Sequence, residues 1–332
     1  MKRGPARFEY YLVKLELLMQ EAAKDHNPAL YLYKNDARTP LFMLEALSRM
    51  YRDIHNSKKF NSLREQFKLL EDGLGTIDYY DAYANSFSKH PMVPAHIREY
   101  MQAQAREKIQ SCNELLTEGK WLAKDSFSAI RKKLKEADWL QPKEELKAIK
   151  AVYEEAIKNT NKFVKDSGGN FTEMENQVHE FRRAIRWLSI YAQALQGCIQ
   201  IMDSDESEQA TKEYLLPEIV NSRFNIMPDA GDNNWFLLLE KNYFYALSWV
   251  ISALGKIKDE GLQYFAVAEA LQQTAGFNHD DALIKSFEIF GVERALYDDL
   301  LARASNITKK FTDQQCLNNM VMGLARTEKS KS

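Results

Sequence analysis

The stretch Val178–Leu195, VHEFRRAIRWLSIYAQAL, decides the fold because its apolar residues recur at the spacing of an α-helix. Residues three and four apart share one face, and the apolar set is Phe181, Ile185, Leu188, Ala192 and Leu195. Basic side chains fill an arc of roughly 100° on the opposite face. They are His179, Arg182, Arg183 and Arg186. These cations repel one another unless something anionic lies among them, so this helix is the main indication of function.

Helical spacing continues through nearly all of the 332 residues, and clear strand alternation between turn signals is absent. Only 13 Gly and 8 Pro are present, which indicates few connections and long elements. We therefore predict an all-α protein. The predicted helices are Ala6–Lys24, Pro40–Ser57, Phe60–Lys89, Pro94–Glu118, Asp125–Ala137, Pro142–Lys165, Thr172–Ile201, Lys212–Ile226, Trp235–Ala275, Ala282–Phe290, Glu293–Ala304 and Thr312–Ala325. We expect Gly75 and Gly255 to break the third and ninth of these helices.

A break at Asp166–Asn170, DSGGN, lies near the middle of the chain. It predicts one all-helical unit of two packed helical-bundle halves, about 1–166 and 167–332. Two short matches lie on either side of it, Leu-Gly-Thr-Ile-Asp at 74–78 and Leu-Gly-Lys-Ile-Lys at 254–258. An arginine-bearing helix precedes each match, Leu41–Ile54 in the first half and Val178–Leu195 in the second. We interpret this arrangement as an internal duplication.

Composition narrows the function further. A net charge of −2 argues against a general nucleic-acid binder, which usually carries a positive balance. Basic residues gather locally at 120–165, with a cluster at Arg131–Lys135, and acidic residues gather at 203–208. Three widely spaced cysteines without a C-x-x-C motif fit a reducing compartment. No run of 18 apolar residues exists, and the N-terminal segment reads as an amphipathic helix, so we expect a cytoplasmic protein without a membrane partner.

Motifs of catalysis are absent from the sequence. It contains no G-x-x-x-x-G-K-[ST], no H-E-x-x-H and no G-x-S-x-G. Glu175 and His179 are one residue too far apart for the Glu-x-x-His motif of a di-iron bundle. The acidic pairs at 280–281 and 298–299 lack a third carboxylate one turn on. We therefore expect a non-enzymatic protein with no cofactor and no metal site.

The motifs resemble the CHAD family (conserved histidine α-helical domain), in which each half opens with the pattern H-x-x-R-x-x-x-[RK]-x-L and later has an LG motif. His179, Arg182, Arg186 and Leu188 match the first pattern, and 254–259 matches the LG motif. The first half departs from the family. Phe42 stands where the histidine belongs and Glu45 where the first arginine belongs, while Arg49 is retained and Arg52 lies on an adjacent turn. Asp78 and Tyr79 replace the basic and acidic positions of the first LG motif.

The resemblance implies an all-helical, duplicated fold that binds inorganic polyphosphate in a basic groove between the halves. The leading hypothesis is therefore a polyanion-binding domain for polyphosphate or a phosphorylated ligand. The candidate anion-binding residues are His179, Arg182, Arg183, Arg186, Arg49, Arg52 and Lys258. One alternative is a solvated helix face whose cations pair with Glu175, Glu180 or another helix. The other is a degenerate relative that has lost its ligand and serves as a scaffold for a protein partner.

Overall fold

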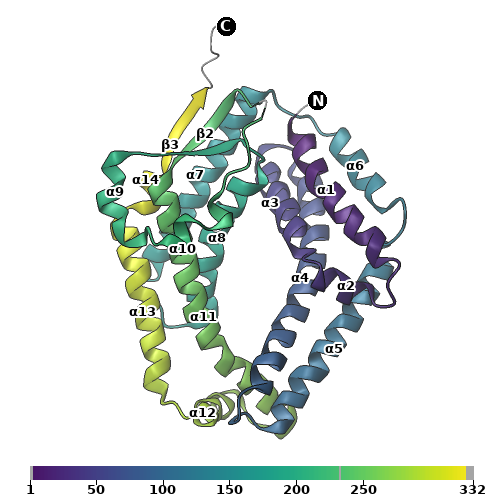
Figure 1. Cartoon of the computed structure of the whole chain (residues 1–332), viewed down its shortest axis with the longest axis vertical. Helices are drawn as coiled ribbons and strands as arrows, with labels where there is room; N and C mark the ends of the chain where they lie inside the picture. Colours follow the sequence, from purple (N-terminus) through teal and green to yellow (C-terminus); the bar gives the residue numbers. More distant parts are fainter. Residues whose placement is uncertain (1–2, 232, 327–332) are drawn as a thin grey trace.

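The computed structural model describes residues 3–231 and 233–326, without the side chains of Asp205 and Glu206 in the acidic segment. Helices make up most of it, so the prediction of an all-α protein is confirmed, with one small sheet as the exception. Two helices, α3 (Arg38–Ile54) and α8 (Glu180–Ala194), pack against each other near the centre of the molecule (Figure 1). The arginine-bearing segments of the two predicted halves are therefore direct neighbours.

Two long arms run from this central contact to the lower end of the molecule (Figure 1). One consists of α4 (Ser57–Ser88) and α5 (Ala95–Glu118), and the other of α11 (Lys241–Ala275) and α13 (Arg294–Asp313). At the lower end α5 contacts α11 beside α12 (His279–Phe290), around a second, smaller apolar core. There the hydroxyls of Tyr80 and Tyr100 both donate to Glu269 Oε1, at 2.7 and 2.8 Å. The arms are thus joined at both ends.

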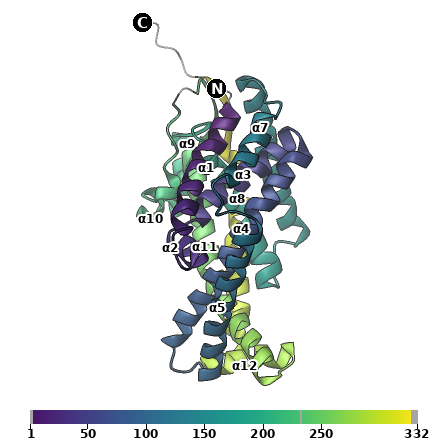
Figure 2. The same cartoon turned by 90° about the vertical axis from the view of Figure 1, so that its right-hand side faces the viewer.

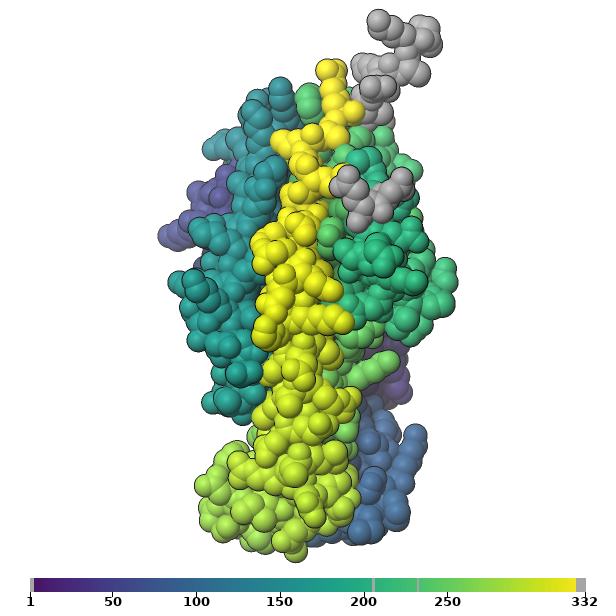
Figure 3. Space-filling model, turned by 90° about the vertical axis from the view of Figure 1, so that its left-hand side faces the viewer, coloured from purple at the N-terminus to yellow at the C-terminus, as the bar shows by residue number. Residues whose placement is uncertain are grey.

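Shorter helices cover the outside of this frame. The first arm packs against α2 (Pro28–Lys34) (Figure 2). The first helix, α1 (Arg3–Ala22), lies against α3 and α6 (Ser126–Lys135) (Figure 1). On the other side, α13 runs along the surface beside α7 (Pro142–Asp166) (Figure 3). One main core extends from Phe8 to Met320 and so draws on both predicted halves. The division at Asp166–Asn170 and the internal duplication stay predictions.

The expected breaks at Gly75 and Gly255 are wrong. Both glycines lie inside uninterrupted helices, Gly75 in α4 and Gly255 in α11. A glycine costs a helix only about 1 kcal/mol relative to alanine. The fully buried neighbours Leu74 and Leu254 belong to apolar stripes packed in the main core, and this tertiary packing outweighs that cost.

A three-stranded sheet replaces parts of three predicted helices, which is a second correction. In it, β1 (Ile199–Met202) pairs in parallel with β2 (Trp235–Glu240), and β2 pairs in antiparallel fashion with β3 (Val321–Arg326). Short apolar runs such as Trp-Phe-Leu-Leu-Leu fit a helix and a strand equally well. Partners distant in the sequence decide between them here: Leu237 lies opposite Ile199 on one side and Leu324 on the other.

The predicted helix Lys212–Ile226 is also wrong. The chain instead forms a short α10 (Pro217–Val220) between two single 3₁₀ turns, at Lys212–Tyr214 and Arg223–Asn225. Leu216 is extended, as the residue before a proline prefers, and this separates α10 from the turn before it. Two further short helices are α9 (Asp205–Thr211), which begins in the acidic segment at 203–208, and α14 (Cys316–Met320), which lies between α13 and β3.

Candidate functional site

The basic helix predicted at Val178–Leu195 begins earlier, with one wide π-helical turn at Met174–His179, and this turn continues without a break into α8. Gln177 Oε1 caps this turn by accepting the backbone N–H groups of Thr172 and Glu173, at 2.6 and 3.2 Å. The turn places His179 Nδ1 3.0 Å from Glu175 Oε1. Such π turns are rare and are frequent at functional sites.

Three of the predicted site residues gather around the Glu175 carboxylate. The His179 hydrogen bond is the largest cause that lowers the pKa of Glu175, and the charges of Lys258 and Arg183 act in the same direction. Arg183 also contacts Glu180, with Nη1 2.9 Å from Oε1. Lys258 Nζ lies 2.8 Å from Asp259 Oδ1. For these three basic side chains, the structure contains the carboxylate partners that the solvated-face alternative expects.

Arg182 is held by the backbone of α11 and not by a carboxylate. Its Nε donates to the carbonyl oxygen of Ile251 in α11, at 3.0 Å. The guanidinium lies directly on Gly255, where a β-carbon would come within 3.1 Å of Nε and Nη2. Burial lowers the pKa of Arg182, and the charge of Asp259 opposes this shift. Within the described chain, no carboxylate forms an ion pair with Arg182.

Arg186 has no hydrogen-bond acceptor or carboxylate within bonding distance among the described residues. Its guanidinium carbon lies 4.6 Å from the ring centre of Phe42 in α3, and that of Arg38 lies 5.4 Å from the same ring. Burial, followed by the charges of Arg182 and Arg38, lowers the pKa of Arg186 to about 10. Arg186 is therefore still a cation at neutral pH, half-buried and repelled by its neighbours. We call Arg38, Arg182 and Arg186 the arginine cluster.

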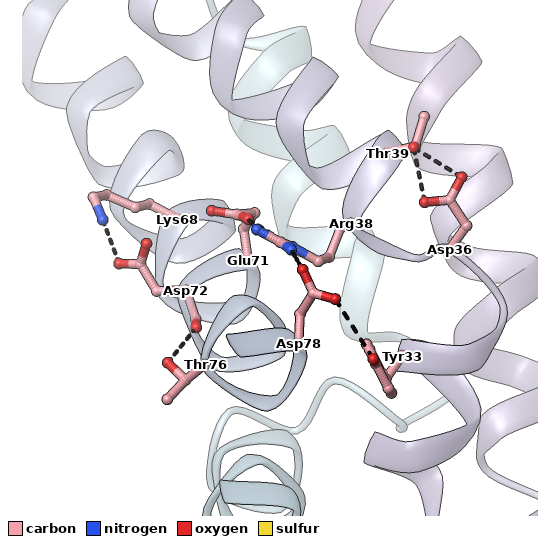
Figure 4. A network of polar contacts seen from close by, with 9 residues as sticks. All are labelled: Tyr33, Asp36, Arg38, Thr39, Lys68, Glu71, Asp72, Thr76 and Asp78. Carbon is pink, nitrogen blue, oxygen red and sulfur yellow. Dashed lines mark hydrogen bonds and ion pairs between the residues drawn. The ribbon is translucent and has the colours of Figure 1, made fainter. Parts of the chain in front are cut away.

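Arg38 is the member of this cluster that the sequence analysis missed. Its Nε and Nη2 donate to Glu71 Oε1 at 2.9 and 2.7 Å, and its Nη1 donates to Asp78 Oδ2 at 2.7 Å (Figure 4). It lies on Gly75 as Arg182 lies on Gly255, because a β-carbon on Gly75 would be 3.0 Å from Arg38 Nη2. The paired LG motifs were the signal for it, since each glycine accommodates an arginine from an earlier helix.

The remaining candidates lie in ion pairs on α3. Arg49 Nη2 lies 2.7 Å from Glu45 Oε1, and its guanidinium also covers the Trp187 ring at 4.3 Å. Arg52 donates two hydrogen bonds to the carboxylate of the neighbouring Asp53, at 2.8 and 2.9 Å. Of the second basic cluster, Arg131 is bound by two carboxylates of α1, at 2.8 and 2.7 Å. The structure thus brings together Arg182 and Arg186 from the predicted set and leaves these others with partners of their own.

No family model, curated protein or solved structure matches this chain. Across the described residues, no group of three or more His, Cys, Asp or Glu side chains is arranged to hold a metal ion. None of the described helices has both the length and the apolar character that a membrane span requires. The geometry of the arginine cluster is therefore the basis for a functional interpretation.

The contact between Arg38 and Gly75 predicts a difference between two glycines of α4. Gly73→Ala is expected to raise the free energy of unfolding by about 1 kcal/mol, the helix-propensity gain. The new β-carbon would meet only Leu115 and Cys112, at ordinary distances of 3.5 and 3.6 Å. Gly75→Ala should gain little or lose stability, because Arg38 must move. Urea unfolding of both variants measures this, and equal stabilisation would contradict the close contact.

Proposed function

We propose that this protein binds a phosphate-bearing anion through Arg182 and Arg186 and does not catalyse a reaction. The observation that carries the proposal is the Arg186 guanidinium, half-buried beside two other guanidiniums and without an acceptor among the described residues. An anion there would relieve the repulsion within the cluster. Arginine also presents a planar fork of donors that matches phosphate oxygens.

The two arginines are supported from opposite sides. They stand on consecutive turns of α8, about 6 Å apart along its axis. Gly255 and the Ile251 carbonyl oxygen of α11 support Arg182, and the Phe42 ring of α3 supports Arg186. Phe42, which replaces the histidine of the CHAD pattern, thus acts as a platform for an arginine. The resemblance to that polyphosphate-binding family favours a phosphate-bearing ligand.

Binding without catalysis is the simpler interpretation of these groups. A guanidinium donates hydrogen bonds but does not exchange a proton near neutral pH. His179 and Glu175, the candidates for proton transfer on the same segment, are bonded to each other. The arrangement therefore favours holding charge over moving protons.

Titration calorimetry with pyrophosphate at two salt concentrations tests the proposal. Wild-type protein is expected to bind, and to bind more weakly at higher salt because the charges are screened. Arg182→Ala/Arg186→Ala should lower the affinity by about 100-fold or more, since each charge-assisted hydrogen bond contributes about 1.5–3 kcal/mol.

The matched control is Arg106→Ala/Arg303→Ala, which makes the same change in charge at two exposed arginines of α5 and α13. It should leave the affinity within about threefold of wild type, because the charges of these two exposed arginines are screened by salt from an anion bound at Arg182 and Arg186. Equal weakening in both double variants would show a general charge effect and contradict the assignment to Arg182 and Arg186.

A second candidate function is a scaffold for a protein partner. It is favoured by exposed apolar side chains in the segment around α10, where Phe224 and Ile226 are 60% and 68% exposed. Isolated exposed apolar residues are common, whereas a group of them often marks an interaction surface. This function needs no anion, so a wild-type protein that binds no pyrophosphate at low salt would favour the scaffold.

A further inference from the structure

The surroundings of Gly75 and Gly255 are built alike but carry opposite charges. In each, a leucine precedes the glycine, an isoleucine follows two residues later, and an arginine from another helix lies across the glycine. Four residues before the glycine, α4 has Glu71 where α11 has Ile251. Three residues after it, α4 has Asp78 where α11 has Lys258.

This difference decides what each arginine contacts. Arg38 is held by two carboxylates, Glu71 on one edge of the guanidinium and Asp78 on the other. Arg182 has one backbone carbonyl on Nε, from Ile251. The Glu71 side chain is 8% exposed and the Asp78 side chain 51%, so the first carboxylate is built into the helix contact and the second faces water.

We infer that Glu71 and Asp78 serve as an intramolecular anion on Arg38 and thereby leave the site with free cations for one compact phosphate group, so that an extended phosphate chain gains no further affinity. The inference rests on the proposed function, because Arg182 and Arg186 must bind the anion. The ligand class is then orthophosphate or a phosphomonoester.

The position of the charges explains the restriction. A phosphate chain carries negative charge on every unit, so each unit beyond the first needs a further cation. The next cation beside Arg186 is Arg38, on the same Phe42 ring, and three of its five N–H donors already bind the carboxylates of α4. A chain extending there would meet the carboxylates of α4, and like charges in contact repel strongly where water is partly excluded.

Beside Arg182, at the other end of the arginine cluster, the neighbouring cation is also paired with a carboxylate. Asp259 acts on Arg182 from α11, and the neighbouring Lys258 is already in contact with Asp259. Glu175, in the π turn, is ionised and surrounded by its own cations. Carboxylates therefore act on the open arginines from two elements, α11 through Asp259 and α4 through Glu71.

The test compares orthophosphate with linear tripolyphosphate, by calorimetry on the full chain. In wild type the two affinities should agree within about threefold. Glu71→Gln/Asp78→Asn removes the two negative charges beside Arg38 with nearly unchanged side-chain shape. It should raise the affinity for tripolyphosphate about tenfold, the effect of one added charge-assisted hydrogen bond, and change that for orthophosphate less.

Glu65→Gln/Asp72→Asn is the matched control, with the same substitutions at exposed positions of α4. It should leave the ratio of the two affinities unchanged. Thermal unfolding confirms that each variant is folded, and Asp78→Asn alone, at the half-exposed carboxylate, should shift the ratio in the same direction by a smaller factor.

The outcomes separate the two proposals. An unchanged ratio in folded Glu71→Gln/Asp78→Asn, together with binding that depends on Arg182 and Arg186, contradicts the selectivity and leaves the anion site standing. A wild type that already prefers tripolyphosphate by more than about threefold contradicts it as well. Orthophosphate binding that is insensitive to Arg182→Ala/Arg186→Ala contradicts the proposed function itself.

Discussion

Replacing Glu145 with alanine is expected to lower the free energy of unfolding by about 3–5 kcal/mol, the cost of leaving a buried charge without its partner. Glu145 in α7 and Arg7 in α1 are each 3% exposed, and Arg7 Nη1 lies 3.1 Å from Glu145 Oε2. The Tyr51 hydroxyl of α3 donates to the other carboxylate oxygen at 2.9 Å. The substitution would leave the Arg7 charge inside the main core without a carboxylate partner.

The hydrogen bonds of Arg7 also reach the start of the sheet, so we expect the loss of stability to involve more than the contact between α1 and α7. Arg7 also donates to the Tyr51 hydroxyl and to Cys198 Sγ just before β1. Burial raises the pKa of the Cys198 thiol, so the sulfur stays neutral beside Arg7. Removing the carboxylate thus leaves Arg7 with neutral partners alone, and the α1, α3, α7 and β1 elements lose their common ionic contact.

Urea unfolding followed by circular dichroism measures this change. The control is Glu16→Ala, which removes a carboxylate from the more exposed ion pair with Arg131. That pair should contribute about 0–1 kcal/mol. If Glu145→Ala costs no more than Glu16→Ala, the buried network does not stabilise the fold.

Gly197→Ala is expected to cost about 2–4 kcal/mol, from a strained backbone and an overpacked contact. Gly197 connects α8 to β1 with φ at +78°, where side chains are disfavoured. Its β-carbon would lie 2.2 Å from the carbonyl oxygen of Asp229 and 2.8 Å from the α-carbon of Ala230. Both obstacles are backbone, so the loop before β2 must move.

Gly168→Ala separates the two contributions. Gly168 has a similar φ of +65°, but nothing lies within 4 Å of the position of its β-carbon. It should therefore cost about 1–2 kcal/mol, the strain of the left-handed conformation alone. Thermal or urea unfolding compares the two variants. Equal losses in the free energy of unfolding would show that the loop at Asp229 moves away from the new β-carbon without loss of stability.

The arginine cluster was only partly visible in the sequence. Arg182 and Arg186 stand out because helical spacing places them on the polar face of α8. Arg49, Arg52 and Arg183 stand out for the same reason, yet each has a carboxylate partner one to four residues away along its own helix. Helical spacing reports which face a side chain is on, and it does not report which neighbour has already neutralised it.

The sequence by itself determined most of the long helices, because the repeat of apolar residues every three or four positions is a local property of the chain. It also marked the basic face of α8 and the two glycines that receive arginines. Only the tertiary structure decided that Gly75 and Gly255 lie within unbroken helices and that Trp235–Glu240 is a strand. Only it revealed Arg38 beside Arg186 on the Phe42 ring. Each of these depends on contacts between residues distant in the sequence, which can override a local preference of about 1 kcal/mol per residue.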